Sequence, residues 1–291
     1  MQDARQIPLL LGHSPDPDDA FMFYAMAEGK IDLRGYTFEH ILQDIQTLNQ
    51  RALGGELHIS AVSIHALAYI LDRYALLPTG ASMGDGYGPM FVTRELAGLE
   101  DGADWDSRKR WLSARTIAVP GTMTSAFLAA RLFLGEFNYV VVPFDEIFSA
   151  VQSGVADVGL LIHEGQLTFA SEGFSLVGDL GVWWLEETGL PLPLGGNVIR
   201  KDIPLAQQAE ISAILRESIA YGLAHRAPAV THSMPLARGM DEALADKFIG
   251  MYVNDLTLDY GDRGRRAISE FLRRGALAGI IPAEPKIEFV P

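Results

Sequence analysis

The sequence contains no cysteine, and this absence excludes disulfide bonds, thiolate metal ligands and cysteine nucleophiles. No uninterrupted apolar run approaches the ~20 residues of a membrane-spanning helix. Basic residues are scarce, because 23 Lys and Arg stand against 37 Asp and Glu for a formal net charge of −14. This balance would repel a phosphate backbone, so neither nucleic acid nor a membrane surface is an expected partner.

Several familiar motifs are also missing. No apolar segment with a small-residue cleavage site follows the N-terminal residues 1–5, so we expect no export signal and a cytoplasmic protein. The chain lacks a Gly-Lys-Ser/Thr phosphate loop and a Gly-x-Gly-x-x-Gly turn between strand and helix. It also lacks an Asp-x-Asp-x-Asp-Gly loop, and we expect no metal site. The oligomeric state is left open.

What the chain does contain is a repeated alternation of strands and helices. With 291 residues and a hydrophobic fraction of 48%, it can bury a full core. Periodicity predicts strands at 7–13, 37–41 and 57–62, with helices at 18–28 and 44–53. After a glycine-rich stretch at 84–89, a strand at 90–93 and a polar loop at 95–113, a second series begins. It comprises strands 116–119, 139–144 and 155–162, and helices 123–134 and 145–152.

This restart predicts an α/β protein of two lobes with a cleft between them. We assign residues 1–93 and 197–291 to lobe 1, and residues 94–196 to lobe 2. The chain would return to lobe 1 through the Pro- and Gly-rich stretch 189–196, which is followed by a strand at 197–200 and a largely helical remainder.

His163 is the leading candidate for a catalytic residue. It follows a continuous apolar strand, with Ile162 before it and Glu164 after it, and ligands of α/β sheets bind at the carboxyl ends of strands. An imidazole there can titrate near neutral pH and act as a general base. The alternative is a hydrogen-bonded histidine at a strand end that takes no part in chemistry.

A second candidate site is the turn at residues 120–125, which opens the helix after strand 116–119. Free backbone N–H groups and the hydroxyls of Thr122, Thr124 and Ser125 could bind a carboxylate without any lysine. The same residues also suit simple helix capping, and the two interpretations are compatible.

Further polar residues follow the first and third strands. Ser14, Asp16 and Asp18 follow the first strand, where they suit hydroxyl recognition, although at least one carboxylate there is expected to cap the next helix. Ser63 ends the third strand and could offer its hydroxyl to a ligand or cap the helix after it.

Several strings together resemble the MqnA/MqnD family of menaquinone biosynthesis by the futalosine route. They are His13-Ser14-Pro15-Asp16-Pro17-Asp18-Asp19-Ala20-Phe21, Val119-Pro120-Gly121, Leu161-Ile162-His163-Glu164, Asp179-Leu180-Gly181-Val182-Trp183-Trp184 and Thr188-Gly189-Leu190-Pro191-Leu192-Pro193-Leu194-Gly195. The resemblance spans nearly the whole chain. The His-Glu pair and the Trp-Trp pair look more like the branch of 1,4-dihydroxy-6-naphthoate synthases than the chorismate dehydratase branch.

The resemblance implies a periplasmic-binding-protein type II fold and a lyase that needs no cofactor. Its substrate would be cyclic dehypoxanthinyl futalosine, a small carboxylated molecule that is cleaved to 1,4-dihydroxy-6-naphthoate. His163 matches the proposed base, Thr124 and Ser125 match the hydroxyls that hold the carboxylate, and Ser63 matches another cleft position. Lobe closure would exclude water from the reacting substrate.

The chain departs from the family pattern at two positions. That pattern commonly reads Ser-Pro-x-Pro-Asn-Asp-Thr-Phe, whereas this chain has Asp18 for the Asn and Ala20 for the Thr. A carboxylate in place of an amide donor would favour a substrate hydroxyl at that point. The departures leave a different substrate open, and the alternatives to the synthase are a non-catalytic binding protein for small carboxylates and a chorismate dehydratase.

Overall fold

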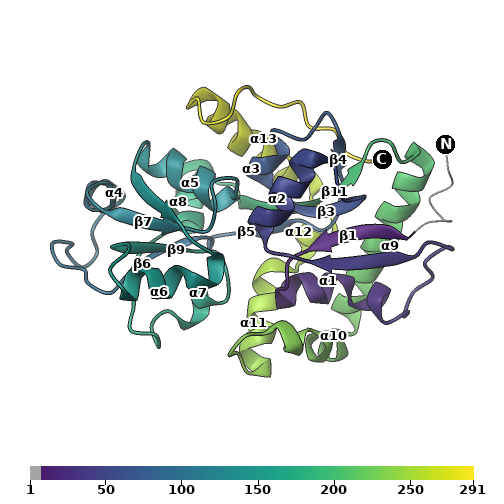
Figure 1. The fold of residues 1–291 in the computed structure, drawn as a ribbon, viewed down its shortest axis with the longest axis horizontal. Helices are drawn as coiled ribbons and strands as arrows, with labels where there is room; N and C mark the ends of the chain where they lie inside the picture. The colour runs from purple at the N-terminus through teal and green to yellow at the C-terminus, as the bar shows by residue number, and fades with distance from the viewer. Residues whose placement is uncertain (1–7) are drawn as a thin grey trace.

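The computed structural model describes residues 8–291. Two β-sheets with helices on their faces lie side by side along the long axis of the molecule (Figure 1), which confirms the predicted two-lobed α/β architecture. Ile7 at the start of the first predicted strand, and residues 1–5 that bear on an export signal, lie outside the described residues. Among the described helices, none combines the length and apolar character needed to span a bilayer.

Lobe 1 is built on a mixed sheet in the order β2-β1-β3-β11-β4, with β5 also paired to β11. β1 runs parallel to β2 and β3, whereas β11 runs antiparallel to β3, β4 and β5. The strands are β1 (Leu9–His13), β2 (Phe38–Leu42), β3 (Ile59–Ser63), β4 (Tyr74–Leu76), β5 (Ser82–Gly84) and β11 (Leu192–Arg200).

Helices cover both faces of this sheet (Figure 1). α1 packs against α9, α10 and α11 on one face, and α2, α3 and α13 lie on the other. The helical elements of lobe 1 are α1 (Pro17–Ala27), α2 (Ile45–Gly54), α3 (Ile64–Leu67), α9 (Leu205–Ala224), α10 (Arg226–Ser233), η3 (Met234–Leu236), α11 (Glu242–Tyr252), α12 (Asp255–Leu258) and α13 (Gly261–Leu277).

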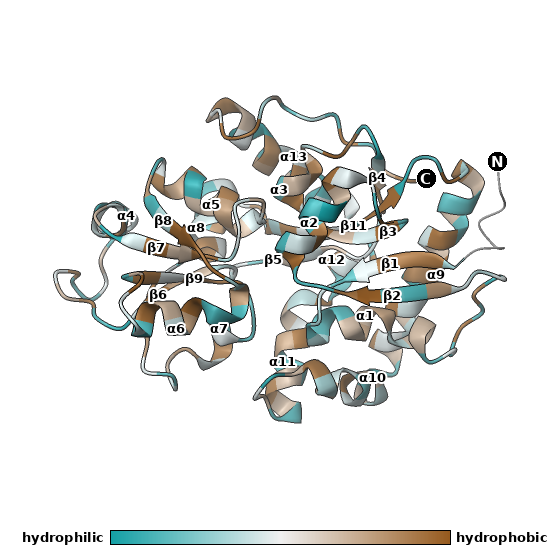
Figure 2. Cartoon of the chain, viewed as in Figure 1, coloured by the Kyte–Doolittle hydropathy of each residue, from teal (hydrophilic) through white to brown (hydrophobic). Residues whose placement is uncertain are grey.

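Lobe 2 is built on a sheet in the order β10-β6-β9-β7-β8. Its strands are β6 (Met90–Thr93), β7 (Thr116–Val119), β8 (Asn138–Val141), β9 (Val158–Leu161) and β10 (Ser175–Asp179). Its helical elements are α4 (Trp105–Ser113), α5 (Ser125–Leu134), η2 (Phe144–Glu146), α6 (Ile147–Gln152), α7 (Gly165–Thr168) and α8 (Leu180–Thr188). Figure 2 shows the apolar strands of both sheets between helices that carry polar residues outward.

Two local predictions were wrong. The strand at 90–93 was assigned to lobe 1, but β6 pairs with β9 and β10 of the second sheet, where Phe91 and Val92 are fully buried. The polar segment 95–113 contains α4, because Asp104 caps it by accepting a hydrogen bond from Ser107 N at 2.8 Å. The stretch 189–196 does lead back to lobe 1, and its residues 192–196 already belong to β11.

The two lobes are joined where β5 leaves lobe 1 and β11 returns to it. Leu192 and Gly84 are register partners in this antiparallel pair. The chain therefore enters and leaves lobe 2 at one place, and residues 194–197 of β11 continue along the boundary between the lobes. We propose on this basis that the change from lobe 1 to lobe 2 lies between β5 and β6.

Candidate functional site

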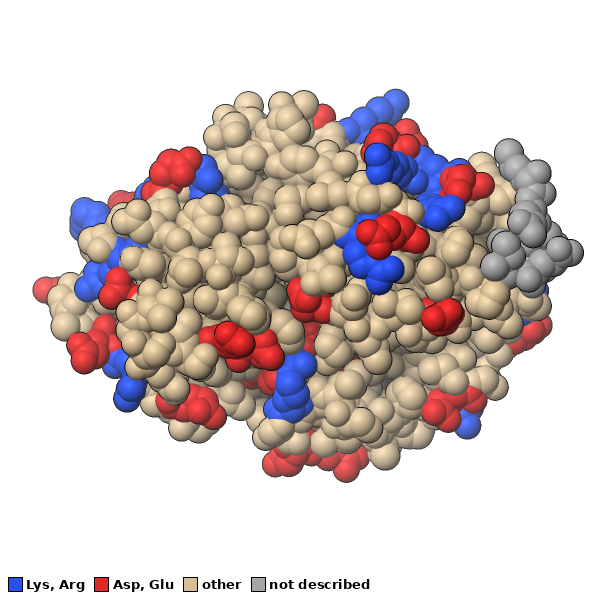
Figure 3. Space-filling model, in the orientation of Figure 1, with Lys and Arg blue, Asp and Glu red and all other residues tan. Residues whose placement is uncertain are grey.

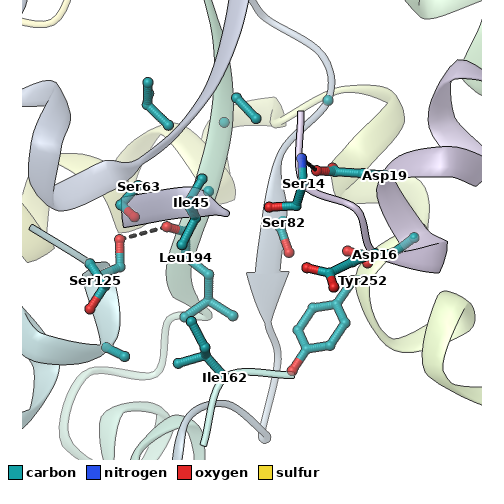
Figure 4. Close-up of a pocket in the computed structure, with 18 of the residues that line it drawn as sticks. Ser14, Asp16, Asp19, Ile45, Ser63, Ser82, Ser125, Ile162, Leu194 and Tyr252 are labelled. Carbon is teal, nitrogen blue, oxygen red and sulfur yellow. Dashed lines mark hydrogen bonds between the residues drawn. The ribbon is translucent and has the colours of Figure 1, made fainter. Parts of the chain in front are cut away.

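A cavity of about 120 Å³ lies between the lobes, and its walls come from both of them (Figure 4). The carboxyl ends of β1 and β3 supply Ser14 and Ser63, and lobe 2 supplies Ser125 and Ile162. The other lining residues are Asp16, Asp18, Asp19, Met22, Ile45, Ala61, Val62, Gly80, Ser82, Pro89, Thr124, Ala126, Gln166, Leu194, Gly195, Gly196, Asn197, Phe248 and Tyr252.

Three carboxylates gather at the start of α1. Asp16 occupies the N-cap position, but its side chain makes no capping hydrogen bond and instead accepts one from Arg238. Asp19 Oδ2 accepts a hydrogen bond from Ser14 N at 2.6 Å, which ties the helix to the end of β1. Asp18 is half-buried between them and lines the cavity.

Burial raises the pKa of all three carboxyl groups. The pKa of Asp18 rises to about 7, mainly because burial disfavours the carboxylate and secondly because Asp16 lies nearby. The pKa of Asp16 rises to about 6 for the same first reason, although Arg238 opposes the shift. The pKa of Asp19 lies well above its ordinary value. Near neutral pH these three carboxyl groups are therefore partly protonated and partly ionised.

The predicted hydroxyls at the start of α5 are already bonded to protein groups. Thr124 Oγ1 caps α5 by accepting a hydrogen bond from Phe127 N at 3.1 Å. Ser125 Oγ donates to Leu194 O at 2.5 Å and accepts from His65 N at 3.2 Å. Both residues line the cavity, whereas Thr122 does not. The turn thus combines capping with a place in the cavity wall.

Asn197 of β11 presents an unsatisfied acceptor in the same wall. Its side chain is 1% exposed, and its Nδ2 donates to Gly80 O at 3.0 Å. Its Oδ1 is buried without a hydrogen-bond partner. A buried acceptor that lines a cavity is suited to receive a hydrogen bond from a ligand donor.

His163 lies behind the cavity and is not one of its lining residues. Its imidazole is buried between the rings of Phe144 and Phe148, with ring centroids 5.7 Å and 6.1 Å away. Nδ1 accepts a hydrogen bond from Gly165 N at 3.0 Å, which assigns the proton of the neutral ring to Nε2. Nε2 is buried and unpartnered. Burial lowers the pKa of His163, and Glu164 opposes this shift.

Glu164 also lies outside the cavity wall, and it pairs with Arg238. Arg238 Nε donates to Glu164 Oε1 at 2.8 Å, and Nη2 donates to Oε2 at 3.2 Å. The nearest approach of Glu164 to the His163 Nδ1 is 3.7 Å, which is longer than a hydrogen bond. Of the predicted residues, the structure therefore brings together at the cavity Ser14, Asp16, Asp18, Ser63, Thr124, Ser125 and Ile162, and leaves out Thr122, His163 and Glu164.

Sequence reasoning missed several residues that the fold brings to this site. Tyr252 donates a hydrogen bond from its hydroxyl to Gln166 Oε1, and both side chains line the cavity with Asp19, Ser82 and Asn197. Asp19 lies in the string 13–21 that carries part of the family resemblance. No spacing rule connects residue 166 with residue 252. Trp183 and Trp184 are buried in the core and do not line the cavity.

A family model described as menaquinone biosynthesis matches residues 9–277. A protein from Thermus thermophilus called 1,4-dihydroxy-6-naphtoate synthase is 35% identical over 97% of this chain and 99% of its own length. A protein of the same name from Streptomyces coelicolor is 37% identical over 94% of this chain and 95% of its own length. The chain belongs to the menaquinone biosynthesis family. This confirms the family resemblance that the sequence motifs indicated.

Solved structures agree with this assignment to the menaquinone biosynthesis family. A crystal structure of a protein from Archaeoglobus fulgidus is 40% identical, with a TM-score of 0.86 over 94% of this chain and 98% of that one. The alkanesulfonate-binding protein SsuA from Xanthomonas axonopodis has a TM-score of 0.68 at 12% identity, over 100% and 98% of the two chains. The second likeness shows the fold alone, and this fold is the predicted periplasmic-binding-protein type. The chain is accordingly an enzyme of menaquinone biosynthesis built on a binding-protein fold.

Proposed function

We propose that this enzyme is a 1,4-dihydroxy-6-naphthoate synthase that cleaves cyclic dehypoxanthinyl futalosine, a carboxylated substrate. The observation that carries the proposal is a cavity between two lobes, lined by polar and apolar side chains, in a chain whose similarity to synthases of that name covers nearly its full length. Ser14, Ser82 and Asn197 offer groups for substrate hydroxyls. Backbone N–H groups at the first turn of α5, beside Ser125, offer donors for a carboxylate.

We keep His163 as the proposed general base, with one structural condition. Burial lowers the pKa of the imidazole and so favours its neutral form, which is the form that can accept a proton. In the described conformation, however, Gly165 occupies Nδ1 and the ring does not line the cavity. Base catalysis therefore requires the ring to turn toward the cavity, beside Ile162, when substrate binds.

Asp18 is a second candidate for the proton-transferring group. It lines the cavity directly, and burial raises its pKa to about 7, which is close to the value that best suits acid–base catalysis at neutral pH. The position is one where this chain departs from the common pattern of its family. Its protonated form can also donate a hydrogen bond, as an asparagine amide would.

The experiment is an assay of the purified protein with cyclic dehypoxanthinyl futalosine, followed by product absorbance and mass. Chorismate is supplied in parallel, and small carboxylates are screened by thermal shift. Formation of 1,4-dihydroxy-6-naphthoate supports the synthase. Dehydration of chorismate supports the dehydratase, and stabilisation by carboxylates without turnover of either compound supports a binding protein.

A further inference from the structure

The two sides of the boundary between the lobes differ in chemistry. On the side of α3, α5, α8 and α13, both lobes contribute to a single apolar core. Trp184 of lobe 2 meets Phe271 of lobe 1 there, with ring centroids 5.3 Å apart. Separating these faces would expose a large apolar surface to water, so this side is expected to stay together when the cleft opens.

On the opposite side, here called the polar side, the lobes meet through hydrogen bonds of Arg238 beside a smaller apolar cluster. Arg238 follows η3 in lobe 1, and α7 of lobe 2 faces this segment and α11 (Figure 1). Other contacts here include the hydrogen bond from Tyr252 to Gln166 and the packing of Leu167 against the α11 cluster. Figure 3 shows acidic and basic atoms side by side at the boundary between the lobes on the face in view.

One guanidinium neutralises a carboxylate from each lobe. Arg238 binds Glu164 of lobe 2 through two donors, at 2.8 Å and 3.2 Å. Its Nη2 also donates to Asp16 Oδ1 of lobe 1, and Nη1 donates to Pro15 O at 3.2 Å. The planar guanidinium of arginine carries several N–H donors in fixed directions and can bind both carboxylates at once. The single ammonium group of lysine does not offer this geometry. Without this cation, Asp16 and Glu164 would repel each other across the cleft.

The same guanidinium contacts the wall that buries His163. It lies 5.0 Å from the centre of the Phe144 ring, and Phe144 packs against His163. The cavity of about 120 Å³ is small beside the roughly 300–1,000 Å³ of ordinary ligand clefts. A substrate of the size of cyclic dehypoxanthinyl futalosine therefore requires the lobes to part before it enters, and the polar side is where parting disrupts less apolar packing.

We propose that Arg238 is a positioning residue that closes the cleft by bridging Glu164 and Asp16, and that substrate enters when this bridge breaks. The part of the proposal that concerns substrate rests on the proposed function, whereas the closure itself does not. Arg238 then sets how often the cleft is closed and where Phe144, His163 and Glu164 lie relative to bound substrate.

Closure can be measured without any turnover. Because the chain has no cysteine, spin labels can be attached to Ser171→Cys in lobe 2 and Ala243→Cys in lobe 1, both of which are exposed. Electron–electron distance measurements on the ligand-free protein should give one short, narrow distribution. Arg238→Gln should shift this distribution to longer distances and broaden it, and Glu164→Gln should do the same.

Arg226→Gln is the matched control. Arg226 pairs with Asp246 at 2.6 Å and lies over an aromatic ring, Phe21 at 5.5 Å, but both of its partners belong to lobe 1. It should leave the label distance unchanged. Arg238→Lys should give an intermediate distribution, because it keeps the charge without the planar set of N–H donors. An Arg238→Gln distribution that matches the wild-type distribution would overturn the proposal.

Kinetics provide the second measurement. If the enzyme turns over its substrate, Arg238→Gln should lower kcat/KM by about 10–100-fold, the scale expected when a catalytic wall is misplaced, and Arg238→Lys should recover part of the loss. If the wild-type protein does not turn over the substrate while the label distances behave as expected, the proposed function is wrong. Closure of the cleft by Arg238 is then still supported. Normal kcat/KM in Arg238→Gln would reject the positioning role.

Discussion

Asn49 and Ser63 exchange two hydrogen bonds at the wall of the cleft. Asn49 Nδ2 donates to Ser63 Oγ at 3.0 Å, and Ser63 N donates to Asn49 Oδ1 at 2.8 Å. The same Nδ2 also donates to Met123 O of lobe 2 at 3.3 Å. A fully buried amide therefore holds the end of β3, the start of α3 and the turn before α5 in one arrangement.

Replacing this amide should destabilise the protein. Asn49→Ala leaves the Ser63 N–H and the Met123 carbonyl buried without their partner, so we expect a loss of about 2–3 kcal/mol in the free energy of unfolding. Urea denaturation followed by circular dichroism measures it. Asn138→Ala, at an exposed position of β8, should change stability by less than about 0.5 kcal/mol. Equal losses in the two variants would contradict this account.

The cluster at the start of α1 predicts a stability that depends on pH. The pKa of Asp18 is raised from 3.8 to about 7 in the folded protein, so the folded state binds this proton more tightly than the unfolded state. Its stabilising contribution is fully present below about pH 3.8 and is lost as the pH rises through about 7. The pKa of Asp16 moves in the same direction.

Asp18→Asn removes this dependence at one position. At pH 8 the variant should be more stable than the wild type by roughly 1–3 kcal/mol, given 1.36 kcal/mol per pKa unit and partial solvation. The difference should shrink toward pH 4. Melting curves at several pH values measure it, with Asp101→Asn in an exposed loop as the control. A constant difference across this range would show that Asp18 does not titrate as described.

His163 and Asp18 predict different pH profiles of turnover. Because burial lowers the pKa of His163 below 6.5, a reaction that uses it as base should lose rate only on the acid side of that value. If Asp18 is the base, the rate should rise through pH 7. His163→Asn should reduce kcat by about 10²–10⁴-fold if it is the base, while the protein stays folded. Unchanged kcat in His163→Asn would leave Asp18 as the base.

Gly121 predicts a sharp steric effect. Its φ of 146° lies in a region that other residues rarely adopt, and an added Cβ would lie 2.2 Å from Gln46 Oε1. That oxygen accepts a hydrogen bond from Met123 N at 3.1 Å and so links α2 of lobe 1 to lobe 2. Gly121→Ala should cost more than about 1 kcal/mol and weaken substrate binding. Calorimetry can compare it with Gly98→Ala, where φ is 80° and no atom lies within 4 Å.

Local sequence signals predicted most elements of the fold. The strand at 90–93 and the strand at 116–119 were found with the bounds of β6 and β7, because their apolar runs are short and clearly bounded. Which sheet β6 joins was not predictable, since Phe91 and Val92 would suit the core of either lobe. Helix α4 was missed because its sequence is mostly polar and only Trp111 and Leu112 are buried.

At the site, too, features set by nearby residues were predictable, whereas contacts between residues far apart in the sequence were not. Ser14 and Asp18 follow β1 and Ser63 ends β3, and all three line the cavity, where the rule that ligands bind at strand ends would place them. His163 also follows a strand but does not line the cavity, because two phenylalanines from the segment 144–148 enclose its ring. Arg238 lies more than 70 residues from Glu164 and more than 220 from Asp16, and no motif or period relates such positions.

The place of β11 in lobe 1 has a consequence for synthesis on the ribosome. β11 lies between β3 and β4, so the first sheet lacks an inner strand until Arg200 has left the exit tunnel. All strands of the other sheet lie between Met90 and Asp179 and need no later segment. Lobe 2, which is encoded in the middle of the gene, is thus expected to fold first. Lobe 1 can complete its sheet only after β11 has been synthesised.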